Sequence, residues 1–400
     1  MKIAVVGGGS TYTPELVEGF ARLLPGADLH LLDPAADRLA VVGPFARRLN
    51  PRVTWTTDPD EGLDGADIVV IQLRVGGQQA RIHDETFPLA CGCVGQETTG
   101  AGGLAKAVRT VPVVLDIAER AARRAAPGAW IVNFTNPVGI VTRALLDAGH
   151  PAVGLCNVAI GFQRRFAELL GVPPDAVDLD HVGLNHLTWE RAARVDGVDR
   201  LPALLSEFGD DLAAQVGLPP QVLSALGSVP SYYLRYFYAH DQVVREERGR
   251  PTRAHEVARI EAELLRLYAD PALSEKPPLL AQRGGAYYSE AAVGLVNSLT
   301  LDDGAHHAAN VRNSGTLPFL PDEAVIEVTC EVGASGATPR PVAPVGPALS
   351  GLIAAVAAYE ELAVAAAVHG GRSRVYSALL AHPLVGQHER AEALAGEVLA

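Results

Sequence analysis

The amino-acid sequence predicts an α/β protein whose first part is a doubly wound parallel sheet. Two observations lead to this fold class. Short apolar strands alternate with helical segments along residues 1–158, and a glycine-rich turn follows the first strand. Such alternation is typical of a parallel sheet that helices cover on both faces. The pattern changes after Asp178, and we expect residues 159–400 to form an α+β domain that binds substrate and metal and mediates oligomerisation.

The elements of the first part follow from apolar runs, periodicity and proline positions. We expect strands at residues 2–6, 28–32, 52–56, 67–73, 130–134 and 152–156. We expect helices at residues 14–24, 35–49, 111–125 and 138–146. Pro14 and Pro112 would each stand in a first helical turn, where the missing N–H is not needed. Ligands of parallel sheets bind at the carboxyl ends of the strands. The polar residues at these ends are Asn133, Asn136, Cys156 and Asn157.

Three segments shape the expectations for the second part. Residues 182–194 alternate like an antiparallel strand, and residues 253–268 have the periodicity of an amphipathic helix. Residues 350–369 are long, apolar and rich in alanine. We expect this last segment to be a buried helix or a subunit contact, which predicts a homodimer or a homotetramer.

Composition bounds the class of protein and its partners. A chain of 400 residues with 48% hydrophobic and 20% charged residues suits a globular enzyme of two lobes. The formal net charge of −13 argues against nucleic acid and anionic membranes as partners. A local pair of arginines could still hold a small anionic molecule in such a chain.

Cysteine usage and hydropathy predict a cytoplasmic protein. The chain has four cysteines: Cys91, Cys93, Cys156 and Cys330. They do not form a plausible disulfide framework for a chain of this size, so we expect a reducing compartment. The first strand begins at Lys2, which leaves no room for a signal peptide. No uninterrupted apolar run reaches ~20 residues, so no membrane span is expected.

The turn after the first strand is the candidate nucleotide site. Gly7 and Gly9 take the first two positions of G-x-G-x-x-G, which permit a tight turn and the approach of a pyrophosphate to the backbone. Tyr12 stands at the third position, so the helix should pack further from the strand. Asp33 lies at the spacing of a ribose-binding carboxylate, which favours NAD over NADP, although Asp-Pro is also a common turn. The expected dinucleotide contacts of this Rossmann-like part are Gly7, Gly9, Ser10, Thr11 and Asp33.

Cys156 and His186 are the candidate metal ligands, in Gly154-Leu155-Cys156-Asn157 and Gly183-Leu184-Asn185-His186. A thiolate and an imidazole near a nicotinamide could hold a soft divalent metal, and a sugar's vicinal oxygens would complete its coordination. Mixed sulfur, nitrogen and oxygen ligation suits Mn, Fe, Co, Ni or Zn. The alternative is that Cys156 is a buried thiol that acts as a small hydrophobe and His186 is a hydrogen-bonded core histidine.

A series of segments in one order along the chain carries a family resemblance. They are Gly7-Gly8-Gly9-Ser10-Thr11-Tyr12-Thr13-Pro14-Glu15, Gly95-Gln96-Glu97-Thr98, Asn133-Phe134-Thr135-Asn136-Pro137, Gly154-Leu155-Cys156-Asn157-Val158, Gly183-Leu184-Asn185-His186, Arg283-Gly284-Gly285-Ala286-Tyr287, residues 313–325 and His382-Pro383-Leu384-Val385. With these segments the whole chain resembles glycoside hydrolase family 4, in particular its 6-phospho-β-glucosidase branch. The resemblance implies a lactate- and malate-dehydrogenase-like architecture.

The resemblance also implies a mechanism that departs from the usual pair of glycosidase carboxylates. NAD would oxidise the C3 hydroxyl of the sugar to a ketone, and a divalent metal would polarise the carbonyl and acidify the C2 proton. A tyrosine would remove that proton, the aglycone would leave from C1, and water would add there before the hydride returns to C3. A ketone and a divalent cation together stabilise the enediolate, so a weak base suffices.

Three roles are carried over to residues at the chemical centre. Cys156 and His186 match the family's metal ligands, with Mn²⁺ as the expected ion and Fe, Co or Ni as alternatives. Tyr233 looks like the family's catalytic base. A free phenol has a pKa near ~10, which the cation or a neighbouring arginine would have to lower. Without the resemblance, the residues alone do not distinguish Tyr233 from its neighbours Tyr232, Tyr236 and Tyr238.

Four further residues look like substrate contacts. Arg81, which follows a Gly-Gly pair in an expected loop, and Arg253, which opens a helix, match positions that hold a phosphorylated sugar. Asn136 resembles a substrate-contacting asparagine, although an Asn-Pro turn is a serious alternative. Asn157 stands where the α-specific enzymes of the family carry an aspartate that can act as general acid. An amide cannot donate a proton in that way, so Asn157 points to β-glucosides.

Two other functions remain open on the sequence. The nucleotide-binding half would equally suit an NAD-dependent dehydrogenase of a hydroxy acid or a sugar, and a family member acting on another glycoside is a further possibility. A non-catalytic sensor of NAD or sugar phosphate is disfavoured because a sensor needs no base such as Tyr233.

Overall fold

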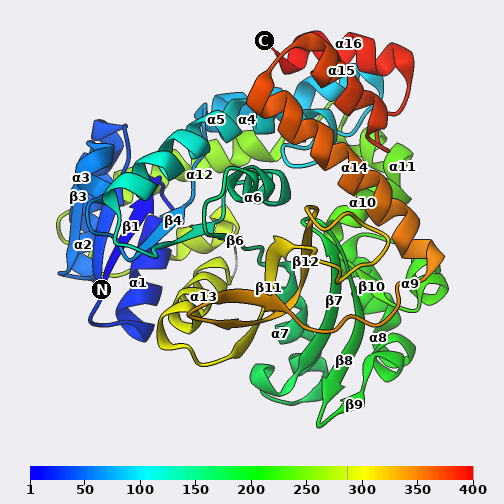
Figure 1. The fold of residues 1–400 in the computed structure, drawn as a ribbon, viewed down its shortest axis with the longest axis horizontal. Coiled ribbons are helices and arrows are strands. Elements are labelled where there is room, and N and C mark those ends of the chain that lie inside the picture. Colours follow the sequence, from blue (N-terminus) through cyan, green and yellow to red (C-terminus); the bar gives the residue numbers. More distant parts are fainter. Residues whose placement is uncertain (286, 400) are drawn as a thin grey trace.

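Six parallel strands form the amino-terminal half of the sheet in the computed structural model, which describes residues 1–285 and 287–399 (Figure 1). Ala286, within the expected 283–287 segment, and Ala400 lie outside the described residues. The order β3-β2-β1-β4-β5-β6 reverses direction beside β1, which creates a binding crevice at the carboxyl ends of the strands. These strands are β1 (Lys2–Val6), β2 (Asp28–Leu32), β3 (Val53–Thr56), β4 (Ile68–Ile71), β5 (Trp130–Asn133) and β6 (Ala152–Gly154).

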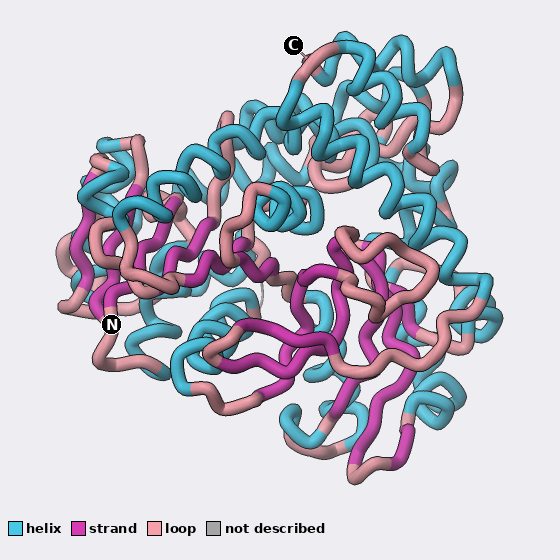
Figure 2. Tube along the Cα trace, in the orientation of Figure 1, coloured by secondary structure: helices cyan, strands magenta, loops and turns pink. Residues whose placement is uncertain are grey.

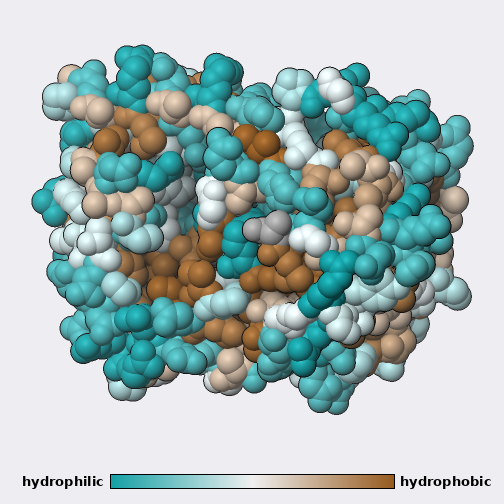
Figure 3. Space-filling model, turned by 90° about the horizontal axis from the view of Figure 1, so that it is seen from above, coloured by the Kyte–Doolittle hydropathy of each residue, from teal (hydrophilic) through white to brown (hydrophobic). Residues whose placement is uncertain are grey.

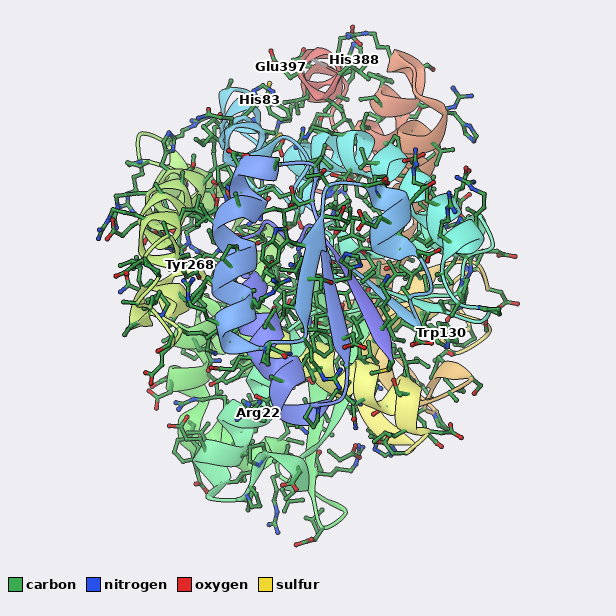
Figure 4. The ribbon with its side chains drawn as sticks, turned by 90° about the vertical axis from the view of Figure 1, so that its left-hand side faces the viewer. Arg22, His83, Trp130, Tyr268, His388 and Glu397 are labelled. Carbon is green, nitrogen blue, oxygen red and sulfur yellow. The ribbon has the colours of Figure 1, made fainter. Side chains whose placement is uncertain are left out.

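Helices lie on both sides of the parallel strands, as Figure 4 shows from the edge of the molecule. They are α1 (Thr13–Leu23), α2 (Ala36–Leu49), α3 (Pro59–Leu63), α4 (Gly77–Thr86), α5 (Gly100–Arg124), α6 (Val138–Asp147) and α7 (Val158–Leu170), with a 3-10 turn η1 (Phe87–Cys91) after α4. The strands are buried on both faces, and β4 consists of four fully buried apolar residues. This burial explains their continuous apolar sequences, and it supplies the hydrophobic free energy that holds the layers together.

The helix expected at residues 111–125 is longer than its sequence indicated. Helix α5 begins at Gly100, so Pro112 stands inside the helix and not in its first turn. Glycines lower helix propensity, which hid the first eleven residues from prediction. Gly102 is required by close packing, because a Cβ there would lie 2.3 Å from the carbonyl oxygen of Asp84. Tertiary contact therefore overrides local propensity in this segment.

Antiparallel strands continue the same sheet into the second half of the chain (Figure 2). Strand β11 joins β6 through the register pair Asn310 and Gly154, and β12, β7, β8 and β10 follow in order. These strands are β7 (Asp178–Leu184), β8 (Leu187–Val195), β9 (Val198–Asp199), β10 (Val229–Pro230), β11 (Ala305–Arg312), β12 (Val325–Gly333) and β13 (Gly336–Pro339). The α/β core with an α+β second part agrees with the predicted fold class.

A tight hairpin replaces the single strand expected at residues 182–194. Strand β7 ends at Leu184 and β8 begins at Leu187, and these two residues are register partners. The intervening Asn185 and His186 form the turn, with His186 at φ 62°. The expectation overlooked that asparagine is a common turn former. The correction matters because it places His186 in the two-residue turn between β7 and β8 and not within a strand.

The remaining helices lie around both halves of the sheet, and α14–α16 cover the top of the molecule in Figure 1. They are α8 (Leu201–Val216), α9 (Pro220–Leu226), α10 (Arg235–Tyr238), α11 (His240–Glu247), α12 (Arg253–Tyr268), α13 (Tyr288–Leu301), α14 (Pro347–His369), α15 (Arg372–Ala381) and α16 (His388–Val398), with 3-10 turns η2 (Pro174–Ala176), η3 (Tyr232–Leu234) and η4 (Pro278–Arg283). Helix α12 packs back on α2, where the rings of Tyr268 and Phe45 stack with centroids 4.4 Å apart. This contact brings Arg253 and Glu261 to the nucleotide-binding half.

Helix α14 is the most apolar long helix in the described residues. By length and composition it is long and apolar enough to cross a membrane, and 50% of its most apolar window is buried. Buried core helices meet the same measure, so it does not overturn the expectation that the chain has no membrane span. Glu360 and Glu361 interrupt the apolar run in the sequence, so no uninterrupted run reaches ~20 residues. The mean hydropathy of the helix window is nevertheless 1.7. One face of α14 packs in the main hydrophobic core through residues such as Ile353, Tyr359 and Ala363.

Candidate active site

A cavity of about 1060 Å³ lies at the carboxyl ends of β1, β2 and β4. Its wall includes three of the predicted dinucleotide contacts: Gly7, Ser10 and Asp33. It also includes three of the predicted substrate contacts: Arg81, Asn136 and Arg253. The structure therefore brings predicted dinucleotide contacts and predicted substrate contacts together in one cavity.

The glycine turn is packed too closely against its neighbours to accept side chains. Gly7 has φ 90°, and a Cβ on it would lie 2.6 Å from the carbonyl oxygen of Gln72. The Gly9 N–H donates to Asp33 Oδ2 at 3.0 Å, so the turn is tied to the end of β2. This glycine cradle, which has Gly7 in the cavity wall and a carboxylate beside it, fits a dinucleotide. Gly9 and Thr11 lie behind the cavity wall, and their roles stay predictions.

Thr11 belongs to a buried polar network that crosses to the second half of the chain. Its hydroxyl accepts a hydrogen bond from Arg283 Nε at 2.8 Å. Arg283 also pairs with Glu261 of α12 at 2.9 Å, and both residues line the cavity. The sequence signal for Arg283 was its place in the segment 283–287, but no ligand role was assigned to it. This network fixes the nucleotide turn against α12.

Cys156, His186 and Tyr233 come together beside this cavity. Cys156 follows β6, His186 lies in the turn between β7 and β8, and Tyr233 lies in η3. The Tyr233 and His186 rings stack with centroids 3.6 Å apart and an interplanar angle of 9°. Tyr288, a cavity residue, donates from its hydroxyl to the carbonyl oxygen of Leu155 at 3.4 Å. The cavity wall thus reaches the residue before Cys156.

The two candidate metal ligands are buried, and their electrostatics suit a cation. Burial lowers the pKa of His186 to about 4, so its imidazole is neutral near pH 7 and has a lone pair for a metal. His186 Nδ1 lies 3.0 Å from Thr98 Oγ1, and this hydrogen bond orients the ring. Burial and the nearby Glu327 carboxylate raise the pKa of the Cys156 thiol well above its usual value. Metal binding displaces the thiol proton, and the metal–thiolate bond would offset the free-energy cost of ionising this buried thiol.

A thiol and an imidazole form an incomplete site by themselves. Within residues 1–285 and 287–399, no group of three or more His, Cys, Asp or Glu side chains is arranged to hold a metal ion. The donor set therefore fits a divalent metal whose remaining ligands come from water or substrate. Burial also raises the pKa of Tyr233 above its usual value, and the neighbouring Cys156 adds to the shift while Arg81 opposes it. For Tyr233 to act as a base near neutral pH, a nearby cation must lower the pKa of its phenol.

A cluster of charges around Glu97 forms the floor of the cavity. Arg81 Nε lies 3.0 Å from a Glu97 oxygen and 2.7 Å from a Glu85 oxygen. Lys106 Nζ lies 2.6 Å from Glu97, and Arg74 pairs with the same carboxylate. Burial opposes ionisation of Glu97, but these three cations hold its pKa well below the usual range. Burial lowers the pKa of Lys106 to about 8. The three cations outnumber the two carboxylates, Glu85 and Glu97, so the cluster keeps net positive charge for an anionic ligand.

The sequence missed part of this cluster and misplaced one member. Arg81 lies within α4 and not in a loop, because the helix begins at Gly77, the second glycine of the Gly-Gly pair. Glu97 and Thr98 stood in a segment of the resemblance, which was the signal that could have singled them out. Lys106 and Tyr288 carried no such signal. Their roles depend on tertiary contacts.

The remaining predicted substrate contacts also lie near the cavity. Arg253 is the first residue of α12 and donates to the Gln282 carbonyl oxygen at 2.8 Å. Asn136 precedes a cis proline, and its buried Oδ1 has no hydrogen-bond partner in the described part of the chain. Asn157 stands at the N-cap position of α7, next to Cys156. A buried amide oxygen without a partner, facing a cavity, is suited to accept a hydrogen bond from a ligand hydroxyl.

The fold has the Rossmann-like architecture that is also found in malate dehydrogenases. A malate dehydrogenase from Cryptosporidium parvum superposes with a TM-score of 0.55 at 13% identity, covering 91% of this chain and 98% of that one, which supports the architecture alone. The chain belongs to glycosyl hydrolase family 4. The family 4 glycosyl hydrolase model matches residues 2–172, and the family's C-terminal domain model matches residues 181–385.

Relatives and solved structures match over the full chain. A 6-phospho-beta-glucosidase from Escherichia coli (strain K12) is 36% identical, with 100% of this chain and 94% of that protein covered. The 6-phospho-beta-glucosidase BglT from Thermotoga maritima is 34% identical, with 100% and 98% covered. A structure of the 6-phospho-beta glucosidase from Thermotoga maritima with manganese, NAD+ and glucose-6-phosphate has a TM-score of 0.93 at 32% identity, covering 100% of this chain and 97% of that one. The predicted family resemblance is confirmed.

Proposed function

We propose that this protein hydrolyses 6-phospho-β-glucosides with NAD and a divalent metal, most simply Mn²⁺, with Fe, Co or Ni as alternatives. One observation carries the proposal. The cavity that contains the glycine cradle also contains Arg81 and Arg253 and reaches the cluster of Cys156, His186 and Tyr233. The proposal is supported by the names and ligands of the relatives in this family.

Each group in the cavity has a role in this chemistry. When bound, NAD accepts and returns a hydride at C3 of the sugar, and the divalent cation withdraws electron density from the sugar's C2 and C3 oxygens. Cys156 and His186 hold the cation, and Tyr233 takes the proton from C2 at its phenol oxygen. The aglycone leaves from C1 and takes up a proton, water then adds its OH to C1 as a proton returns to C2, and return of the hydride to C3 completes the hydrolysis. The surrounding burial limits water near the acidified carbon.

The binding residues select the substrate. Arg81 and Arg253 hold the 6-phosphate through charge-assisted hydrogen bonds, and Asn136 accepts a bond from a sugar hydroxyl through its Oδ1. Asn157 contacts the substrate beside the cation. Because its amide cannot serve as a general acid, as the aspartate of α-specific enzymes can, we assign β-glucosides.

Cleavage with catalytic NAD is the expected outcome of the primary assay. With p-nitrophenyl-β-glucoside-6-phosphate, Mn²⁺, a thiol reductant and NAD well below the substrate concentration, p-nitrophenol should be released over many turnovers. NADH absorbance should not accumulate, because the hydride returns to the sugar. An NAD-dependent dehydrogenase, the second candidate, would instead produce NADH in step with substrate consumption. That result would overturn the proposal.

Removal of the Arg253 side chain should weaken recognition of the phosphate selectively. A hydrogen bond to a charged group contributes roughly 1.5–3 kcal/mol, so Arg253→Ala should raise KM for the phosphorylated substrate by about 10- to 100-fold. Activity on the unphosphorylated glucoside should change little. Arg259→Ala is the matched control, because Arg259 is an exposed residue of the same helix outside the cavity wall. Equal effects on both substrates would contradict a phosphate role.

Assembly and location complete the proposal. We propose a cytoplasmic homodimer or homotetramer that has no nucleic acid or membrane partner. All four cysteines are free thiols, which suits a reducing compartment. In Figure 3, apolar side chains gather on the upper face of the molecule, where α5 and α14–α16 lie in Figure 1. The large apolar residues exposed on these elements and at their ends are Val113, Val368, Leu380 and Leu399. A second copy would cover them.

A further inference from the structure

A buried polar cluster lies directly behind the two candidate metal ligands. It consists of His181, Asn185, Glu190, Asn310 and Glu327, which we call the Glu327 cluster. All five residues are buried, and Glu327 is only 1% exposed. They come from β7, the following turn, β8, β11 and β12, so the cluster spans the antiparallel half of the sheet. A buried carboxylate in such a place requires hydrogen-bond partners, because its desolvation is costly.

Glu327 is held on three sides. Its Oε2 accepts hydrogen bonds from Asn185 Nδ2 at 3.0 Å and from Asn310 Nδ2 at 2.8 Å. Its Oε1 lies 3.0 Å from His181 Nε2, and the other nitrogen of His181 lies 2.6 Å from Glu190. The carboxylate therefore has one fixed orientation. Its second oxygen is shared by two amides that come from different parts of the chain.

One of these amides is next to a candidate ligand in the sequence, and the other pairs with the strand that leads to the second ligand. Asn185 directly precedes His186 in the hairpin turn, and its side chain also hydrogen-bonds with Cys156. Asn310 is the register partner of Gly154, two residues before Cys156. The contact is close enough that a Cβ on Gly154 would lie 2.8 Å from the Asn310 Cβ. One carboxylate thus connects the segment of His186 with the segment of Cys156.

We propose that Glu327 is a positioning residue that sets the separation of the two metal ligands before the metal arrives. The inference rests on the proposed metal site. Residues that hold ligands through hydrogen bonds without contacting the metal typically change metal affinity by ~10- to 100-fold when replaced. A purely structural role for the cluster would lower stability without a selective effect on the metal.

The test is a titration of the full-length apo protein with Co²⁺, whose bond to a thiolate gives a charge-transfer absorption in the near ultraviolet. The wild type should show this band at saturation, and Cys156→Ser should lose it. Glu327→Gln should bind Co²⁺ about 10- to 100-fold more weakly. Asn310→Ala removes one link while the Glu327 carboxylate keeps its hydrogen bonds with Asn185 and His181, and it should weaken binding in the same direction if Glu327→Gln does not fold.

Glu190→Gln is the matched control. Glu190 is equally buried and contacts the same histidine, but it hydrogen-bonds with His181 and does not join the link between Asn185 and Asn310. It should lower the melting temperature while leaving Co²⁺ affinity within about threefold of the wild type. NAD affinity should be unchanged in every folded variant, because the cluster lies outside the cavity wall.

The outcomes separate this inference from the proposed function. If Glu327→Gln and Asn310→Ala bind Co²⁺ as tightly as the wild type, or if Glu190→Gln weakens binding equally, the positioning role is overturned while the metal site stands. If the wild type gives no thiolate band, or if Cys156→Ser retains it, the metal assignment fails and the positioning role fails with it.

Discussion

Tyr233→Phe should lower kcat on the phosphorylated β-glucoside by about 10²- to 10⁴-fold, the usual contribution of a positioned general base. The substitution deletes the phenol oxygen that would take the C2 proton. It keeps the aromatic ring that stacks on His186 with centroids 3.6 Å apart. Metal affinity and folding should therefore stay close to those of the wild type. Steady-state kinetics with p-nitrophenyl-β-glucoside-6-phosphate, together with a Mn²⁺ titration, measure both expectations.

The neighbouring tyrosine provides the control for this variant. Tyr232 is 43% exposed, and its hydroxyl accepts a hydrogen bond from Arg235 at 3.0 Å at the surface of the same 3-10 turn. Tyr232→Phe should change kcat by less than about threefold, because a surface hydrogen bond contributes little. Full activity of Tyr233→Phe would contradict the assignment of the base. Loss of metal affinity in that variant would indicate that the phenol acts through the metal site instead.

Cys156→Ser should abolish metal-dependent hydrolysis while the protein remains folded. A serine hydroxyl is a much poorer ligand for a soft or borderline divalent metal than a thiolate, so Mn²⁺ affinity should fall by at least about 100-fold. The change in volume is small, and burial raises the pKa of the thiol well above its usual value, so the apo protein loses no ion pair. Far-ultraviolet circular dichroism, NAD binding and Mn²⁺ titration separate these effects.

A second buried thiol tests whether the loss is specific. Cys93 is 1% exposed and its sulfur lies 3.9 Å from the carbonyl oxygen of Cys91, away from the cluster of Cys156, His186 and Tyr233. Cys93→Ser should retain metal affinity and activity. Chelation should inactivate the wild type, and activity that persists after chelation without added metal would count against Cys156 as a ligand.

Local patterns in the sequence predicted much of the fold but not its long-range contacts. The strands at Lys2–Val6 and Asp28–Leu32 and the helix Arg253–Tyr268 match the expected bounds residue for residue, because apolar runs and helical periodicity are local properties. The start of α5 was missed because its glycines predict no helix. These glycines are required by close contacts with the backbone of other segments. Such contacts leave no periodic signal.

The candidate site shows the same division. The glycine turn, Cys156 and His186 could be singled out from residue type and position, and the resemblance singled out Tyr233. The partner of His186 is Thr98, 88 residues away, and the carboxylate that holds Asn185 is Glu327, 142 residues away. The three cations around Glu97, and Glu327 itself, could not be recognised before the strands and helices were placed in space.

The left-handed backbone of His186 implies a compromise between stability and activity. A non-glycine residue at φ 62° costs about 1 kcal/mol relative to an unstrained position, and glycine would avoid that cost in this turn. The hairpin would therefore be more stable with a residue that has no imidazole. Stabilising this turn by sequence optimisation would remove the very side chain proposed to bind the metal, so thermostable variants of this enzyme should be sought elsewhere in the fold.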